Sequence, residues 1–253
     1  MNNTRYSRLL WSILPVVVFL LIWEAVARLK LFPGDIFFPP FSTVITEFYY
    51  LTVSGVLVKD FLSSLSRVLI GFCAGSIAGI ITGVIMGWRE TIRRSLSPLV
   101  SLIYPIPALG WLPLLMLWIG INEMLPITII FICSFFPVLY NTVTGIKSVD
   151  AGHIQVARTL GASDIKILTT VVIPLALPNI FTGLRLEAGM AWRVIIAAEM
   201  VAIPTGIGAL MMKAESLLRI DIIIICLIVL SIMCLSFEKV FSWLEEKITA
   251  EWK

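Results

Sequence analysis

The stretch VLIGFCAGSIAGIITGVIMGW, residues 68–88, decides the fold class of this chain. Its 21 residues carry no charge, and an arginine flanks it on each side, at Arg67 and Arg89. About 20 such residues, rising about 1.5 Å each, cross the hydrocarbon core of a bilayer as one α-helix. We therefore expect this stretch to span a membrane as a helix.

The same stretch has a glycine at every fourth position. Glycines at this spacing form a stripe along a helix where a second backbone can approach closely, as small residues do between membrane helices. Each glycine costs about 1 kcal/mol of helix propensity relative to alanine in water. We predict that another helix packs along this stripe, which consists of Gly71, Gly75, Gly79, Gly83 and Gly87.

The whole chain has the composition of an integral membrane protein. Of its 253 residues, 59% are hydrophobic and 14% are charged, whereas a soluble domain is about half apolar and about a quarter charged. The net charge of +3 is too small to indicate a nucleic-acid partner. We expect an all-α integral membrane protein whose residues 1–253 form a single domain in the lipid bilayer.

Long apolar runs predict six membrane-spanning helices in total. They cover residues 9–29, 63–88, 95–120, 124–146, 175–201 and 221–243. With the N-terminus inside, eleven Lys and Arg residues fall in cytoplasmic segments and five outside, so the positive-inside rule places both termini in the cytoplasm. The first run could instead be a cleaved signal peptide, but its apolar length favours an uncleaved span.

Prolines interrupt the third and fourth predicted spans. Proline removes a backbone hydrogen bond and kinks a helix, and kinked membrane helices line cavities or bend around partners. A single-helix anchor would not need them. These prolines are Pro98, Pro105, Pro107, Pro113, Pro126 and Pro137.

The fifth predicted span, residues 175–201, contains Arg185, Glu187, Arg193 and Glu199. At mid-membrane these four would together cost roughly 10–14 kcal/mol, more than the apolar residues of the span return. The helix must therefore face protein or a wet path. A helical wheel groups most of its candidate path residues on one face. In the alternative interpretation, the arginine and glutamate at its ends only reach the two membrane surfaces. The candidate path residues are Arg185, Gly189, Trp192, Arg193 and Glu199.

The sequence lacks the motifs of a membrane enzyme. It contains no GxxxxGK[ST], HExxH or GxSxG pattern, and its single histidine is His153. The four cysteines lie in apolar runs without a CxxC pair, which favours helix packing over metal or disulfide chemistry. We predict no catalytic residue, no metal site and no cofactor on this chain. Any energy for transport would come from another subunit.

The segment QVARTLGASDIKILTTVVIP, residues 155–174, resembles the cytoplasmic EAA loop of the permeases of binding-protein-dependent ABC importers. That loop reads EAA, three residues, Gly, nine residues, then IxLP. Ala157, Gly161 and Pro174 fall in register with this pattern. Gln155 and Val156 stand where the pattern has Glu and the first Ala.

Further stretches are similar to the nitrate/sulfonate/taurine branch of that family. They include PIPALGWLPLLMLWIG at residues 105–120 and GLRLEAGMAW at residues 183–192. The resemblance covers about residues 36–245. It implies the fold of a type I importer permease, with a coupling helix in residues 148–166 between the fourth and fifth spans.

The resemblance also implies partners and a site. The permease would form a homodimer in the cell membrane, bind two ABC ATPase subunits that hold the ATP, and receive its solute from an extracytoplasmic binding protein. The solute would be a small anion such as nitrate, taurine, another sulfonate or bicarbonate, or a heterocyclic vitamin precursor. The residues expected to contact the ATPase are Gln155, Ala157, Arg158, Leu160, Gly161, Ala162 and Asp164.

In that segment the small residues would allow close approach to a partner, and Leu160 would be an apolar anchor. Gly161 suits a helix C-terminus that needs a positive φ. The alternative function is a secondary transporter or channel that works without such partners. It would need coupling-ion sites and usually internal repeats, and the six predicted spans contain no convincing repeat.

Overall fold

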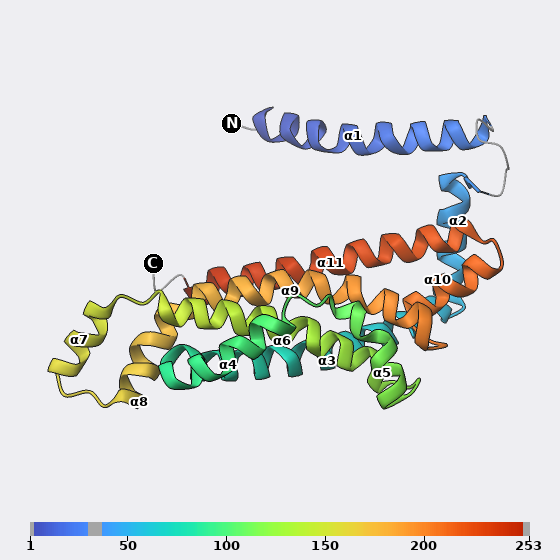
Figure 1. Ribbon diagram of the computed structural model, residues 1–253. Helices are drawn as coiled ribbons and strands as arrows, with labels where there is room; N and C mark the ends of the chain where they lie inside the picture. The colour runs from blue at the N-terminus through green and yellow to red at the C-terminus, as the bar shows by residue number, and fades with distance from the viewer. Residues whose placement is uncertain (1–2, 30–36, 250–253) are drawn as a thin grey trace.

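The computed structural model describes residues 3–29 and 37–249, and this part of the chain is helical with no β-strand (Figure 1). The α-helices are α1 (Asn3–Arg28), α2 (Phe41–Val53), α3 (Val56–Trp88), α4 (Glu90–Ile103), α5 (Leu112–Ile119), α6 (Met124–Lys147), α7 (Ala151–Thr159), α8 (Asp164–Ile167), α9 (Ile173–Ala202), α10 (Ile207–Ser216) and α11 (Ile220–Thr249). A 3₁₀ turn, η1 (Ala108–Trp111), precedes α5, and a π-helical turn, η2 (Leu168–Val172), precedes α9.

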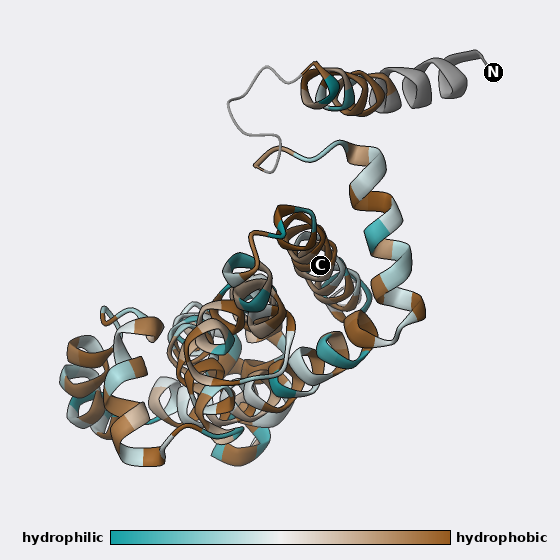
Figure 2. Ribbon diagram, turned by 90° about the vertical axis from the view of Figure 1, so that its right-hand side faces the viewer, coloured by the Kyte–Doolittle hydropathy of each residue, from teal (hydrophilic) through white to brown (hydrophobic). Residues whose placement is uncertain are grey.

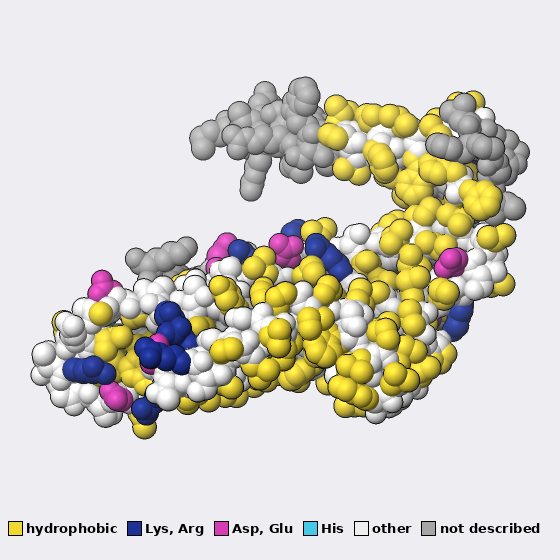
Figure 3. Space-filling view, in the orientation of Figure 1, with side chains coloured by type: hydrophobic (Ala, Val, Ile, Leu, Met, Phe, Trp, Pro, Cys, Tyr) yellow, Lys and Arg dark blue, Asp and Glu magenta, His cyan; other side chains and the backbone are white. Residues whose placement is uncertain are grey.

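The long helices α3, α6, α9 and α11 form the central bundle. α6 lies between α3 and α9, and α9 packs in turn against α11. Side chains such as Ile130, Ile195 and Cys226 are fully buried in this bundle. Figure 2 shows hydrophobic residues throughout the packed helices, and Figure 3 shows a broad hydrophobic surface along the outside of the bundle. A helix bundle with an apolar outer surface is what a lipid environment requires.

α3 and α6 pack backbone to backbone along the glycine stripe. A Cβ added at Gly75 would lie 2.5 Å from the carbonyl oxygen of Phe131, and one at Gly79 would lie 2.7 Å from that of Phe135. Such distances are too short for any side chain. The other three glycines of the stripe, Gly71, Gly83 and Gly87, also face α6.

The third predicted span, residues 95–120, is broken rather than kinked. α4 and the η1–α5 segment meet at 83°. Pro105 and Pro107 lie in the break, where each lacks an N–H and disfavours helix at the residue before it. The helical part begins at Glu90, earlier than the predicted span.

Four helical segments in the described residues are long and apolar enough to cross a membrane. They are α3, α6, α11 and a continuous segment from Asp164 to Ala202 that joins α8, η2 and α9. The broken α4–α5 pair would be a fifth. The first predicted span, residues 9–29, forms α1, which lies apart from the bundle in both ribbon views and contacts α2. The number of six spans remains a prediction.

The two ends of the bundle differ. α7 and α8 lie at one end, together with the last turn of α11, while α2, α5 and α10 lie towards the other (Figure 1). Charged side chains gather at the α7–α8 end (Figure 3). The Arg93–Glu90 and Arg158–Asp164 ion pairs belong to this end.

Candidate functional site

The helix α7 has a defined start and a defined stop. The Asp150 carboxylate caps its first turn by accepting a hydrogen bond from the backbone N–H two residues later, at 2.6 Å. At the other end Gly161 has a φ of +79°, and its N–H donates to the carbonyl of Arg158 at 2.9 Å. The N–H of Ala162 donates to the carbonyl of Ala157 at 3.1 Å. These two bonds form a Schellman motif.

The Schellman motif gives the two alanines an inward position. Ala157 and Ala162 are half-buried and pack against the hydrophobic core of the bundle. These contacts hold α7 on the bundle, and Ala157 also lines a surface pocket with Val156 and Leu160, so the expected contact of the two alanines with an ATPase stays a prediction. The positive φ expected at Gly161 is present, and open space surrounds this residue.

Three apolar side chains at the same end point outward. Leu160 is 82% exposed, Ile165 is 76% exposed and Val156 is 60% exposed. We call these residues the apolar trio. Gln155 is exposed beside them, and Arg158 pairs with Asp164 at 3.3 Å on the surface. An exposed pair of this kind contributes about 0–1 kcal/mol to stability.

The segment behind the apolar trio is one long helical rod. α8 runs through η2 into α9, which makes 39 helical residues from Asp164 to Ala202. In η2 the N–H of Ile173 donates to the carbonyl of Leu168, five residues back. Pro174 follows directly and has no N–H, and a π turn accommodates such a mismatch without ending the helix. A displacement at α8 would therefore be carried into α9.

A pocket lies where the α4–α5 span is broken. It is lined by residues 104–108 of the break, by α6 around Cys133 and Phe136, and by α9 at Glu187 and Met190. Each element contributes from the middle of its length, so the pocket would lie near the middle of a bilayer. Non-helical backbone at that depth occurs only where protein buries it or where it lines a water-filled cavity.

Glu187 is the only carboxylate among the residues that line this pocket. It is 6% exposed, and the Cys133 thiol donates to its Oε2 at 3.5 Å. A thiol is a weak donor. No lysine or arginine lines the pocket, and the salt bridges found among the described residues do not include Glu187.

The candidate path residues of α9 mostly lie on a packing face instead. Arg185 pairs with Glu245 of α11 at 3.2 Å. Trp192 is buried, stacks on Phe61 of α3 and meets Phe237 of α11 edge-on. The helical wheel grouped these side chains on one face, and α11 and α3 cover that face.

Of the three remaining candidate path residues, two are buried and one is exposed. Gly189 is buried, and its carbonyl accepts a hydrogen bond from the Cys234 thiol at 3.6 Å. Arg193 is exposed, and its Nη1 contacts the Sδ of Met190 at 3.5 Å. Glu199 is fully buried. Of the five, only Arg193 is thus exposed close to a residue of the pocket.

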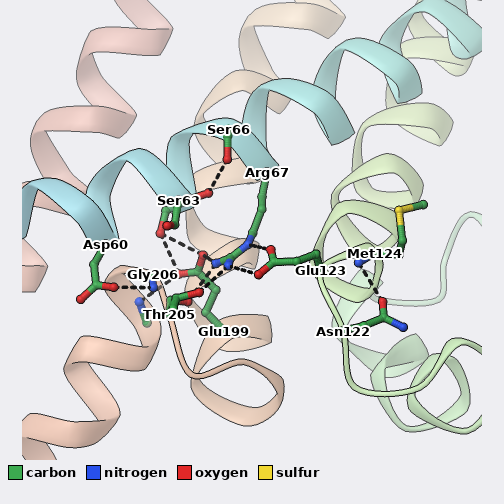
Figure 4. A network of polar contacts seen from close by, with 12 residues as sticks. Asp60, Ser63, Ser66, Arg67, Asn122, Glu123, Met124, Glu199, Thr205 and Gly206 are labelled. Atoms are coloured by element: carbon green, nitrogen blue, oxygen red, sulfur yellow. Dashed lines mark hydrogen bonds and ion pairs between the residues drawn. The ribbon is translucent and has the colours of Figure 1, made fainter.

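Glu199 belongs to a buried ionic network at the end opposite α7 (Figure 4). Arg67 of α3, 2% exposed, donates from Nη1 to Glu199 at 2.6 Å. It also holds both carboxylate oxygens of Glu123, at 2.6 and 2.8 Å, and donates to the carbonyl of Thr205 at 2.9 Å. Its hydrogen bonds lower the pKa of the Glu123 carboxyl from its ordinary value.

The same network holds the start of α10. Glu199 accepts hydrogen bonds from the Ser64 hydroxyl at 2.8 Å and from the N–H of Gly208 at 3.0 Å. Ser64 accepts from the N–H of Ile207, and Asp60 accepts from the N–H of Gly206, each at 2.9 Å. These acceptors satisfy N–H groups that a helix start leaves without partners. The network joins α3, α9 and α10 and the residue preceding α6.

Arg67 and Ile165 were not among the candidates predicted from the sequence, and Glu187 was named only as one of the charges of the fifth predicted span. Arg67 flanks the apolar stretch and continues the glycine stripe towards the start of α3. Ser64 and Asp60 lie three and seven residues before it. Glu187 is three residues from Met190, which places both on one side of α9. Ile165 had no comparable signal, because its exposure depends on how α8 joins α9.

Comparisons with known proteins point to one family. The family model described as "Binding-protein-dependent transport system inner membrane component" matches residues 75–250. A protein of Methanocaldococcus jannaschii named as an ABC transporter permease is 40% identical over 207 residues, which cover 81% of this chain and 78% of that protein. The taurine transport system permease protein of Escherichia coli is 34% identical over 245 residues, which cover 94% of this chain and 88% of that protein.

Solved structures share the fold. The crystal structure of an amino acid ABC transporter with histidines superposes with a TM-score of 0.66 at 20% sequence identity. The match covers 79% of this chain and 97% of that chain.

Proposed function

Since the chain belongs to the binding-protein-dependent transport system inner membrane component family, we propose that its pocket at the helix break is part of the solute path of an ABC importer. The chain is a multi-pass membrane protein and the permease subunit of such an importer. Its partners are an ATPase and a solute-binding protein. The chain itself would hold no nucleotide, because the ATP is bound by the ATPase.

The apolar trio at the α7–α8 end is the proposed docking site for the ATPase. A capped helix end that presents apolar side chains beside an exposed ion pair has the pattern of an interface anchor with a polar rim. The observation that carries the proposal is that Val156 and Leu160 are exposed at the capped end of α7 and Ile165 is exposed on the adjoining α8. With the ATPase in the cytoplasm, both termini would be cytoplasmic.

The rod from Asp164 to Ala202 is the proposed link between docking and transport. Closure of two ATPase subunits would move α7 and α8, and the continuous helix would pass this movement to Glu187 and Met190 at the pocket. At its far end the rod is held by the Glu199–Arg67 ion pair. The pocket would then open alternately to the two sides. Two copies of the chain would form the complete path.

The relatives suggest the range of solutes. The Escherichia coli relative is named for taurine, a small sulfonate that also carries an amine. We propose a small molecule of this size class, delivered by the external binding protein.

Replacing Leu160 with aspartate is expected to weaken ATPase binding at least tenfold. Replacing an apolar interface anchor with a charged side chain weakens the binding free energy by about 2 kcal/mol or more. A change of about 1.4 kcal/mol corresponds to a tenfold change in affinity. The measurement is the amount of ATPase that co-purifies with the tagged permease, together with ATP-driven uptake. The change leaves Asp150 and Gly161 in place, and their hydrogen bonds at the two ends of α7 use no side-chain atom of Leu160, so α7 should keep its structure.

The matched control is Leu217→Asp. Leu217 is 73% exposed and follows α10 at the opposite end of the bundle. This variant should retain the ATPase. Full retention of the ATPase by Leu160→Asp would contradict docking at the apolar trio.

A further inference from the structure

We propose that the pocket at the helix break binds a positively charged group of the solute, an ammonium or amidinium, through the carboxylate of Glu187. The inference rests on the proposed solute path and names the chemical class of the solute. Molecules with an amine would fit this pocket, whereas plain oxyanions would not.

The first argument is the contrast between two glutamates of α9. Glu199 is buried with a complete set of partners, namely a guanidinium, a hydroxyl and a backbone N–H. Glu187 is buried to nearly the same degree, and the hydrogen bond found for it comes from the thiol of Cys133 at 3.5 Å. A buried carboxylate is costly unless it is paired. Glu187 therefore has the environment of a group whose partner arrives with the solute.

The second argument is the shortage of free backbone N–H donors in residues 104–107 of the break. Pro105 and Pro107 contribute carbonyl oxygens and no N–H. The N–H groups of Tyr104 and Ile106 already donate to the carbonyls of residues 100 and 103, at 2.9 and 3.0 Å. The backbone of residues 104–107 thus offers carbonyl acceptors and no free N–H, and the one side-chain donor of this segment is the Tyr104 hydroxyl, which can also accept. An ammonium needs acceptors, whereas a nitrate or sulfonate oxygen needs donors.

The third argument is the aromatic and sulfur lining. Tyr104 and Phe136 present rings at the pocket, and the face of such a ring attracts a cation. Neither arginine of α9 lines the pocket, since Arg185 pairs with Glu245 and Arg193 contacts Met190. Glu187 is therefore the residue that gives the lining a negative charge when it is ionised.

Cys133 provides a native probe for this charge, because its thiol lies beside Glu187 in the lining. The other three cysteines, Cys73, Cys226 and Cys234, are replaced with alanine. The full chain with its ATPase is placed in liposomes and treated with one of two methanethiosulfonate reagents of similar size. One carries a trimethylammonium group and the other a sulfonate. The rate of Cys133 modification is followed by mass spectrometry, and the cation-to-anion rate ratio is divided by that for free 2-mercaptoethanol.

We expect this normalised ratio to be about tenfold above unity, because a carboxylate a few ångströms away attracts one reagent and repels the other. It should fall severalfold towards unity in Glu187→Gln and stay high in Glu187→Asp. Both reagents require the same thiolate, so any effect of Glu187 on thiolate formation cancels in the ratio.

One result would overturn the inference, namely an equal normalised ratio in the wild type and Glu187→Gln. Co-purification of the ATPase is measured in parallel and should be retained by Glu187→Gln. If the ATPase does not co-purify with the wild-type permease, that result would contradict the proposed function itself, independently of the modification-rate ratio.

Discussion

Replacing Arg67 with methionine should lower the free energy of unfolding by about 3–5 kcal/mol, the cost of leaving one partner of a buried ion pair alone. The Glu199 carboxylate is fully buried in the folded bundle, and the change leaves it without its guanidinium partner. It also removes the bonds to Glu123 and Thr205. A native protein is stable by only about 5–15 kcal/mol, so we expect a large drop in the temperature at which the detergent-solubilised permease unfolds.

Two further variants separate the cause of this loss from a general effect of removing arginine. Arg94→Met removes an exposed partner of Glu90 and should cost about 0–1 kcal/mol. Arg67→Met combined with Glu199→Leu should regain part of the lost stability, because apolar replacement of a whole buried pair is often neutral. Equal unfolding temperatures for Arg67→Met and Arg94→Met would contradict the assigned role of the network.

A single added methyl group at Gly75 should destabilise the bundle by about 1–3 kcal/mol, the range for overpacking. The new Cβ would lie 2.5 Å from the backbone oxygen of Phe131, and backbone cannot rotate away as a side chain can. α3 and α6 would have to separate along the stripe. Gly75→Leu should prevent their packing altogether, which would appear as aggregation or degradation of the expressed permease.

Gly189→Ala is the matched control, because it adds the same methyl group to another buried glycine of a membrane-spanning helix. A Cβ at Gly189 has no neighbour within 4 Å in the described structure, and its φ is not positive. Alanine there should leave the stability unchanged or raise it by up to about 1 kcal/mol. Unfolding temperatures of the two variants in detergent should therefore shift in different directions. A Gly75→Ala permease as stable as Gly189→Ala would contradict close packing at the stripe.

The coupling segment illustrates what a sequence pattern can and cannot predict. The helix in residues 148–166 and the positive φ of Gly161 follow from local chemistry, since a helix stop needs a residue that tolerates this backbone. The direction of each side chain does not follow. Ala157 and Ala162 pack against the bundle because of how α7 lies on it, and Ile165 is exposed because of how α8 joins α9.

The fifth predicted span shows the same limit more strongly. Its charges indicated that the helix could not face lipid, and its neighbours are indeed protein on the side of Arg185, Trp192 and Glu199. A helical wheel shows which residues share a face but not what covers that face. The pocket exists because the broken span places residues 104–108 opposite Glu187.

The sequence by itself determined that this chain is an all-helical membrane protein, and its family resemblance identified an importer permease, which the relatives confirm. Apolar length and helix-breaking residues suffice for the helices, because each membrane helix satisfies its backbone hydrogen bonds within its own segment. Only the tertiary structure decided that Arg67 pairs with Glu199, 132 residues away, and that α6 fills the glycine stripe. The pairing of charges and the contact of backbones depend on which helices lie side by side, and no local stretch of sequence contains that information.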